Sequence, residues 1–101
     1  MSIDKRLRSN FVDDLFDATL LLQNREECYR FFEDVCTVGE IKAIAQRLAV
    51  AKKLDVGEIY SDIANETGAS TATISRVKRC LNYGADGYKL VLERLKKQDK
   101  G

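Results

Sequence analysis

The stretch whose residue types best suit molecular recognition is TGASTATISR, residues 67–76. It holds one glycine, five Ser or Thr residues and a single arginine, and no acidic residue occurs between Glu66 and Asp86. Short hydroxyl and alanine side chains let a helix backbone approach the major groove of DNA closely. There, hydroxyls can hydrogen-bond to base edges and methyl groups can touch thymine. The stretch therefore indicates a surface that reads DNA.

The predicted DNA contacts are the small, polar and basic residues of a helix that starts after residue 70. They are Ser70, Thr71, Ala72, Thr73, Ser75, Arg76, Lys78 and Arg79. Backbone N–H groups at a helix N-terminus suit phosphates, and the three cations would add a salt-dependent attraction. The alternative is a solvated helix whose Ser and Thr residues are only caps. The weak helix propensity of this run favours DNA contact over that alternative.

Two short helices separated by a glycine turn are typical of a helix-turn-helix motif. A small residue is needed where the two helices cross, and Ala64 provides it. Gly68, four residues later, suits the left-handed conformation of the turn. Ile63 lies in the first helix, and Ile74 and Val77 lie one turn apart in the second, so all three can form the shared core. The spacing predicts a helix-turn-helix over residues 58–82.

The remaining sequence must position this motif, and its apolar spacing is helical throughout. Helices are expected over residues 11–22, 25–36, 38–54, 58–67, 71–81 and 86–98. No segment alternates as a strand does. The prediction is an all-α fold of about six helices in a single domain, residues 1–101. Within it, residues 1–54 would serve dimerisation, residues 58–82 would form the helix-turn-helix and residues 86–98 the C-terminal helix.

Residues 24–40 contain two capping-box patterns and an unusually apolar helix. Asn24 with Glu27, and Thr37 with Glu40, each place a capping side chain three residues before a carboxylate. The helix between them is apolar over more than half its circumference and needs cover on several sides. In a chain of 101 residues, the expected cover is a second copy of the protein.

Several kinds of chemistry are not expected from this composition. The chain has no histidine, no glycine-rich phosphate loop and no nucleophile with an evident base beside it, so we predict no enzyme activity, no metal site and no cofactor. Cys28, Cys36 and Cys80 form no CxxC pair. We expect structural thiols, with Cys28 and Cys36 as small core residues.

Charge and hydropathy suggest where the protein acts. No apolar run approaches the roughly 20 residues that span a bilayer, so we expect a cytoplasmic protein with no membrane partner. Residues 1–40 carry five Lys or Arg against nine Asp or Glu, whereas residues 69–101 carry eight against three. A basic rear half could face a polyanion, although two solvated helix faces of opposite sign would give the same totals.

A protein-interaction module, or adaptor, is the alternative function. A helical dimer could use its basic face to bind an acidic protein without specific DNA contacts. Binding faces of that kind usually carry aromatic or large apolar anchors. The start of the helix at residues 70–79 carries none, which favours DNA.

The segment from Thr37 to Leu81, above all GASTATISR, resembles the core of the tryptophan repressor. The chain as a whole is similar to the Trp-repressor-like proteins of the YerC/YecD type, from about residue 11 to residue 95. This resemblance implies an intertwined, all-helical homodimer that binds operator DNA through its helix-turn-helix. It implies a transcriptional regulator, expected to act as a repressor.

The resemblance also identifies residues that could contact a small-molecule effector. Arg47 and Arg76 match the two arginines that hold the indole of tryptophan in the repressor, and Thr37 matches a threonine that contacts the ligand. The sequence departs from the family where Val77 replaces a glycine and Cys80 replaces a serine. The valine side chain would fill space that the indole needs. We therefore expect no tryptophan binding, while a different small effector stays open.

Overall fold

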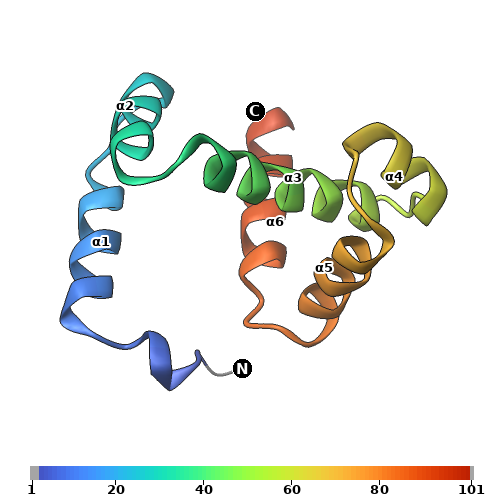
Figure 1. The fold of residues 1–101 in the computed structure, drawn as a ribbon, viewed down its shortest axis with the longest axis horizontal. Helices are drawn as coiled ribbons and strands as arrows, with labels where there is room; N and C mark the ends of the chain where they lie inside the picture. The colour runs from blue at the N-terminus through green and yellow to red at the C-terminus, as the bar shows by residue number, and fades with distance from the viewer. Residues whose placement is uncertain (1–2, 101) are drawn as a thin grey trace. The chain divides into compact units, whose positions relative to one another are not determined.

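The computed structural model describes residues 3–100, with the side chain of Lys100 left undescribed. In this range the chain forms six α-helices and one short 3-10 helix, and no strand. The elements are η1 (Lys5–Leu7), α1 (Asn10–Leu20), α2 (Arg25–Val35), α3 (Val38–Asp55), α4 (Tyr60–Thr67), α5 (Thr71–Tyr83) and α6 (Gly87–Lys100) (Figure 1). The expected all-α class and the six helices are confirmed. The 3-10 helix was not expected from the sequence.

Local capping determines where these helices begin. The Asn24 side chain accepts a hydrogen bond from the backbone N–H of Glu27 at 2.9 Å, and the Glu27 carboxylate accepts one from the N–H of Gln23. At the start of α3, Thr37 and Glu40 bond to each other's backbone N–H, at 2.8 and 3.1 Å. The capping box at Thr37 is thus confirmed. At α2 the Asn24 cap is confirmed, but the Glu27 carboxylate reaches the N–H of Gln23, one residue before the cap.

The chain divides into two compact units, one ending at Lys42 and the other beginning at Ala43. α3 starts in the first unit and continues into the second, and each unit is described here by itself. All the buried hydrophobic residues described lie in the second unit. They are Val50, Ala51, Ile63, Ala69, Ile74, Val77, Leu81 and Leu92. This core joins α3, α4, α5 and α6, so it holds the helix-turn-helix against the helices on either side.

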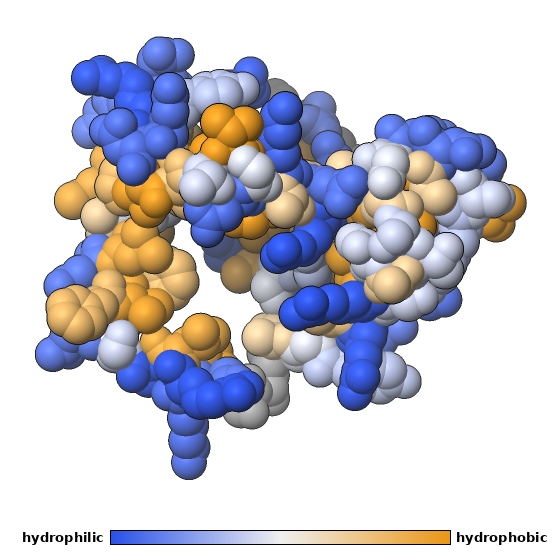
Figure 2. All heavy atoms as spheres, in the orientation of Figure 1, coloured by the Kyte–Doolittle hydropathy of each residue, from blue (hydrophilic) through white to orange (hydrophobic). Residues whose placement is uncertain are grey.

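The N-terminal unit has a different character, because none of the residues of η1, α1 or α2 is buried. Phe11 is 88% exposed and Leu20 is 81% exposed. Figure 2 shows hydrophobic side chains gathered on the surface of this part of the chain. Folded proteins seldom leave such a patch open unless another surface covers it.

One sequence-based expectation was wrong in this unit. Cys28 was expected to be a small core residue, but it is exposed, and Cys36 is only partly buried. The apolar residues around them in sequence lie on a helix without any buried residue in this chain. Apolar neighbours along the sequence therefore did not produce burial.

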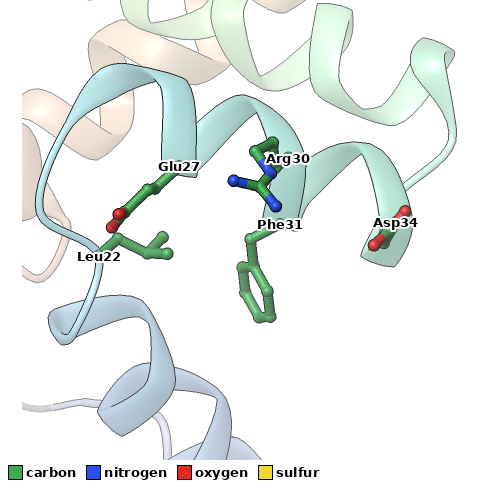
Figure 3. A pocket seen from close by; sticks show the side chains of 5 residues that line it. All are labelled: Leu22, Glu27, Arg30, Phe31 and Asp34. Atoms are coloured by element: carbon green, nitrogen blue, oxygen red, sulfur yellow. The ribbon is translucent and has the colours of Figure 1, made fainter.

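A shallow hollow of about 310 Å³ lies beside the loop between α1 and α2 (Figure 3). Leu22 and Phe31 supply its apolar side chains, and Glu27, Arg30 and Asp34 supply the charged ones. Glu27 already serves as a capping residue for α2. The hollow thus adds partly covered apolar surface to a unit that has no buried residue.

Candidate DNA-reading face and neighbouring cavity

The turn before α5 has the geometry that the sequence predicts. Gly68 has a φ of +75° and ends α4 in the left-handed conformation, which glycine adopts without steric cost. Its N–H donates to the carbonyl of Ala64 at 2.9 Å. Three residues separate α4 from α5. The two short helices and the turn therefore form the predicted helix-turn-helix.

One side of α5 is anchored in the core. Ile74 is fully buried, Val77 is 2% exposed and Leu81 is 8% exposed. These positions follow one another at helical spacing, so they form a single inward stripe. Among the predicted DNA contacts, Thr73 is partly buried, and the other seven are exposed. The core thus fixes α5 with most of its polar residues facing away from it.

Helical spacing divides the exposed residues of α5 into separate strips. Ala72, Ser75 and Arg79 follow one another at three and four residues, on the side opposite the buried stripe. Arg76 lies on one flank of this strip. Lys78 lies on the other, with its ammonium 5.7 Å from the centroid of the Tyr60 ring of α4, within the range of a cation–π interaction.

Ser70, the first of the predicted DNA contacts, has a structural role. The Ser70 hydroxyl accepts a hydrogen bond from the backbone N–H of Thr73 at 3.1 Å and caps α5. The same hydroxyl donates to the Thr73 hydroxyl at 3.0 Å. The predicted cap at Ser70 is confirmed, and these two residues stabilise the start of the helix whatever else they contact.

The basic residues of α5 are free of acidic partners. Within residues 3–100, Arg76, Lys78 and Arg79 form no ion pair. Some lysines elsewhere are paired, for example Lys96 with Asp55 at 2.6 Å and Lys97 with Glu93 at 3.3 Å. The exposed face of α5 therefore carries three positive charges that no acidic residue among the described residues pairs with.

Arg47 of α3 and Arg76 of α5 line the same cavity, which has a volume of about 250 Å³. Its other lining residues are Thr73, Val77, Cys80 and Tyr88. Burial raises the pKa of the Tyr88 phenol, and the two arginines partly oppose this effect. The phenol is thus neutral at ordinary pH and can donate a hydrogen bond. Tyr88 falls within the helix predicted over residues 86–98, and its helical spacing did not indicate a cavity.

The third residue expected to contact an effector, Thr37, belongs to the N-terminal unit. Its hydroxyl and backbone N–H are both engaged in the cap of α3. Arg47 and Arg76 are therefore brought together by the second unit, while the role observed for Thr37 is structural.

In the described part of the chain, no group of three or more Cys, Asp or Glu residues could hold a metal ion. None of the described helices is long and apolar enough to cross a membrane.

The family model of the Trp repressor protein matches residues 10–96. The chain belongs to the Trp repressor family. The helix-turn-helix seen here is thus that of a family of DNA-binding regulators.

Individual relatives agree with this assignment. The uncharacterised protein YerC of Bacillus subtilis is 58% identical over 99 residues, which cover 98% of this chain and 94% of that protein. The crystal structure of a candidate Trp repressor from Staphylococcus aureus has a TM-score of 0.90 and 54% identity, covering 94% of this chain and 96% of its own. A TrpR-like protein from Eubacterium eligens also has a TM-score of 0.90, with 55% identity and coverage of 92% and 96%. The fold is therefore that of Trp-repressor-like proteins.

Proposed function

We propose that the protein is a sequence-specific, DNA-binding transcriptional repressor of the bacterial cytoplasm. In this proposal α5 enters the major groove of operator DNA. The observation that carries it is the division of α5 into a buried apolar stripe and an exposed face with three unpaired cations. The core holds the helix, and the exposed face is left for a polyanion.

The exposed strips of α5 suggest which residues would contact bases and which would contact phosphates. Ala72 and Ser75 lie at the centre and have short side chains, which allow the backbone to approach base edges closely. Arg76, Lys78 and Arg79 would contact phosphates or guanine. Ser70, Thr71 and Thr73 lie at the helix N-terminus, where N–H groups favour a phosphate.

We infer that the repressor acts as a homodimer. The exposed apolar side chains of α1 and α2 support this, because none of the residues of these helices is buried within one chain. A two-fold dimer would present two copies of α5 to DNA. For helix-turn-helix dimers the half-sites lie about 34 Å apart, so the operator would be roughly palindromic.

We further propose that tryptophan is not the corepressor. Val77 is 2% exposed and lines the cavity between Arg47 and Arg76, so its side chain takes up room there. A smaller effector with an anionic group would suit the two guanidinium groups. Arg47 and Arg76, which line this cavity, are the proposed contacts.

The experiment is a selection of bound fragments from genomic DNA, followed by anisotropy titrations of a selected fragment at several salt concentrations. Affinity is expected to fall steeply with salt. Arg76→Ala and Arg79→Ala should each lower the salt slope by about one if the lost contact is to a phosphate. Lys97→Ala removes the same charge from α6, where the lysine pairs with Glu93, and serves as the control. Absence of salt-sensitive binding to any fragment would favour the adaptor function instead.

A further inference from the structure

The turn between α4 and α5 is held partly from another helix. The Gln46 side chain of α3 donates a hydrogen bond from Nε2 to the backbone carbonyl of Thr67 at 3.1 Å. This carbonyl belongs to the last turn of α4, where carbonyls lack intrahelical partners. The contact is partly buried and joins residues 21 positions apart in sequence.

The other hydrogen bonds of this turn are local. The Thr67 hydroxyl donates to the carbonyl of Ile63 at 2.7 Å and accepts from the N–H of Ala69 at 3.1 Å. These bonds shape the turn itself but do not fix it to another helix. Among the described side-chain hydrogen bonds, two run from α3 to the last turn of α4: Lys53 donates to the Glu66 carboxylate, and Gln46 donates to the backbone carbonyl of Thr67, directly before Gly68.

Gln46 belongs to a strip of α3 that faces α4. Val50, one turn later, is fully buried in the core. Lys53, a further turn along, forms ion pairs with Glu58, at 3.7 Å, and with Glu66. This strip therefore contacts the segment before α4, the end of α4 and the turn after it.

We propose that Gln46 is a positioning residue for the recognition helix, an inference that rests on the DNA-binding function proposed above. The turn is only three residues long, so an anchor at Thr67 restricts where α5 begins. The N-terminal end of α5 carries Thr71 and Ala72, whose contacts depend on how the helix enters the groove. Gln46 thus affects base reading without touching DNA.

The test compares Gln46→Met with wild type on the selected operator and on an unrelated duplex. Methionine keeps the length of the side chain and removes the donor. Specific affinity is expected to fall roughly fivefold, the equivalent of a hydrogen bond of about 1 kcal/mol. Affinity for the unrelated duplex and its salt slope should not change, since no charge is altered. Amide hydrogen exchange at Gly68 and Ala69 of the free protein should become faster.

Gln98→Met makes the same chemical change at an exposed position of α6 and should leave all three measurements unchanged. The proposal is overturned if Gln46→Met binds the operator as wild type does, or if specific and unrelated DNA lose affinity equally. Failure of the DNA-binding function would be seen separately, as the absence of specific binding by wild type. In that case the exchange rates would still show whether Gln46 anchors the turn.

Discussion

Arg47 and Arg76, which come from different helices and lie 29 positions apart in sequence, meet at the wall of one cavity. Val77 lines the same cavity and is held in the core of the second unit. The cavity is therefore next to α5 and is lined by a residue that also anchors α5 in the core. Any molecule bound in this cavity would contact α5 directly.

Tryptophan is expected not to bind the wild-type protein at micromolar concentrations. Isothermal titration calorimetry should show no binding heat, because the side chain of Val77 takes up room in the cavity. Val77→Gly removes that side chain, and a gain of tryptophan binding in this variant would identify Val77 as the obstacle. Glycine within a helix costs about 1 kcal/mol relative to alanine, so circular dichroism must first show that the variant is folded. Micromolar binding by wild type would contradict the prediction.

Ser70 should show separable effects on stability and on DNA binding. Ser70→Ala removes the cap of α5 and should lower the free energy of unfolding by about 1 kcal/mol. Ser70→Asp keeps a capping oxygen and favours the helix dipole, so its stability should stay near that of wild type. Its negative charge would lie where a phosphate is expected, and affinity for DNA should fall. Urea unfolding and anisotropy titrations measure the two effects. Unchanged DNA affinity in Ser70→Asp would place the DNA away from this end of α5.

Ile74 should be the most sensitive core position on α5, because it is fully buried. Ile74→Ala should lower the free energy of unfolding by about 2–5 kcal/mol, and Ile74→Val by about 0.5–1.5 kcal/mol. Urea unfolding at fixed protein concentration provides the values. Ser75→Ala, at the exposed neighbouring position, is the control and should change stability little. Equal, small losses for both substitutions at Ile74 would mean that α5 is not anchored through this residue.

The ion pairs of Lys53 predict a dependence of stability on pH. The hydrogen bond from Lys53 lowers the pKa of Glu66 below its ordinary value of 4.5. The contribution of Glu66 to the free energy of unfolding is therefore complete above about pH 4.5. It is lost as the pH falls through the lowered pKa of the folded state. The same hydrogen bond raises the pKa of Lys53 above its ordinary value of 10.5. The contribution of Lys53 to the free energy of unfolding is therefore complete below pH 10.5 and is lost as the pH rises through the raised pKa.

Urea unfolding of wild type and Glu66→Gln across the acid range provides the measurement. The two proteins should differ in stability at neutral pH and converge as the medium becomes more acidic. A constant difference across the acid range would show that the pair does not act through the charge of Glu66.

Much of the fold was predictable because its signals are local. The caps at Asn24, Thr37 and Ser70 each involve residues three positions apart, and Gly68 was identified from the conformation that its turn requires. The inward stripe of α5 follows from helical periodicity. Such features depend on neighbours in sequence, and the structure confirms them.

The remaining features depend on contacts between distant segments. Nothing around Gln46 in the sequence indicates that its amide would meet the carbonyl of Thr67. The place of Tyr88 in the cavity depends on how α6 meets α3 and α5, which its spacing along the helix does not reveal. For Cys28 the sequence was misleading. Its apolar neighbours suggested that it is buried, but it is exposed in the single chain.

The exposed strip of α5 also bears on how related regulators could diverge. Ala72 and Ser75 are exposed, and neither side chain takes part in the hydrogen bonds described within residues 3–100. Ile74 and Val77, which hold the helix, lie on the other side. Under the DNA-binding function proposed above, substitutions at positions 72 and 75 would therefore direct the protein to a new operator while the scaffold stays intact. Because the proposed DNA-reading residues and the residues that stabilise α5 lie on opposite sides of one helix, duplicated copies of this gene would need very few mutations to acquire separate DNA targets.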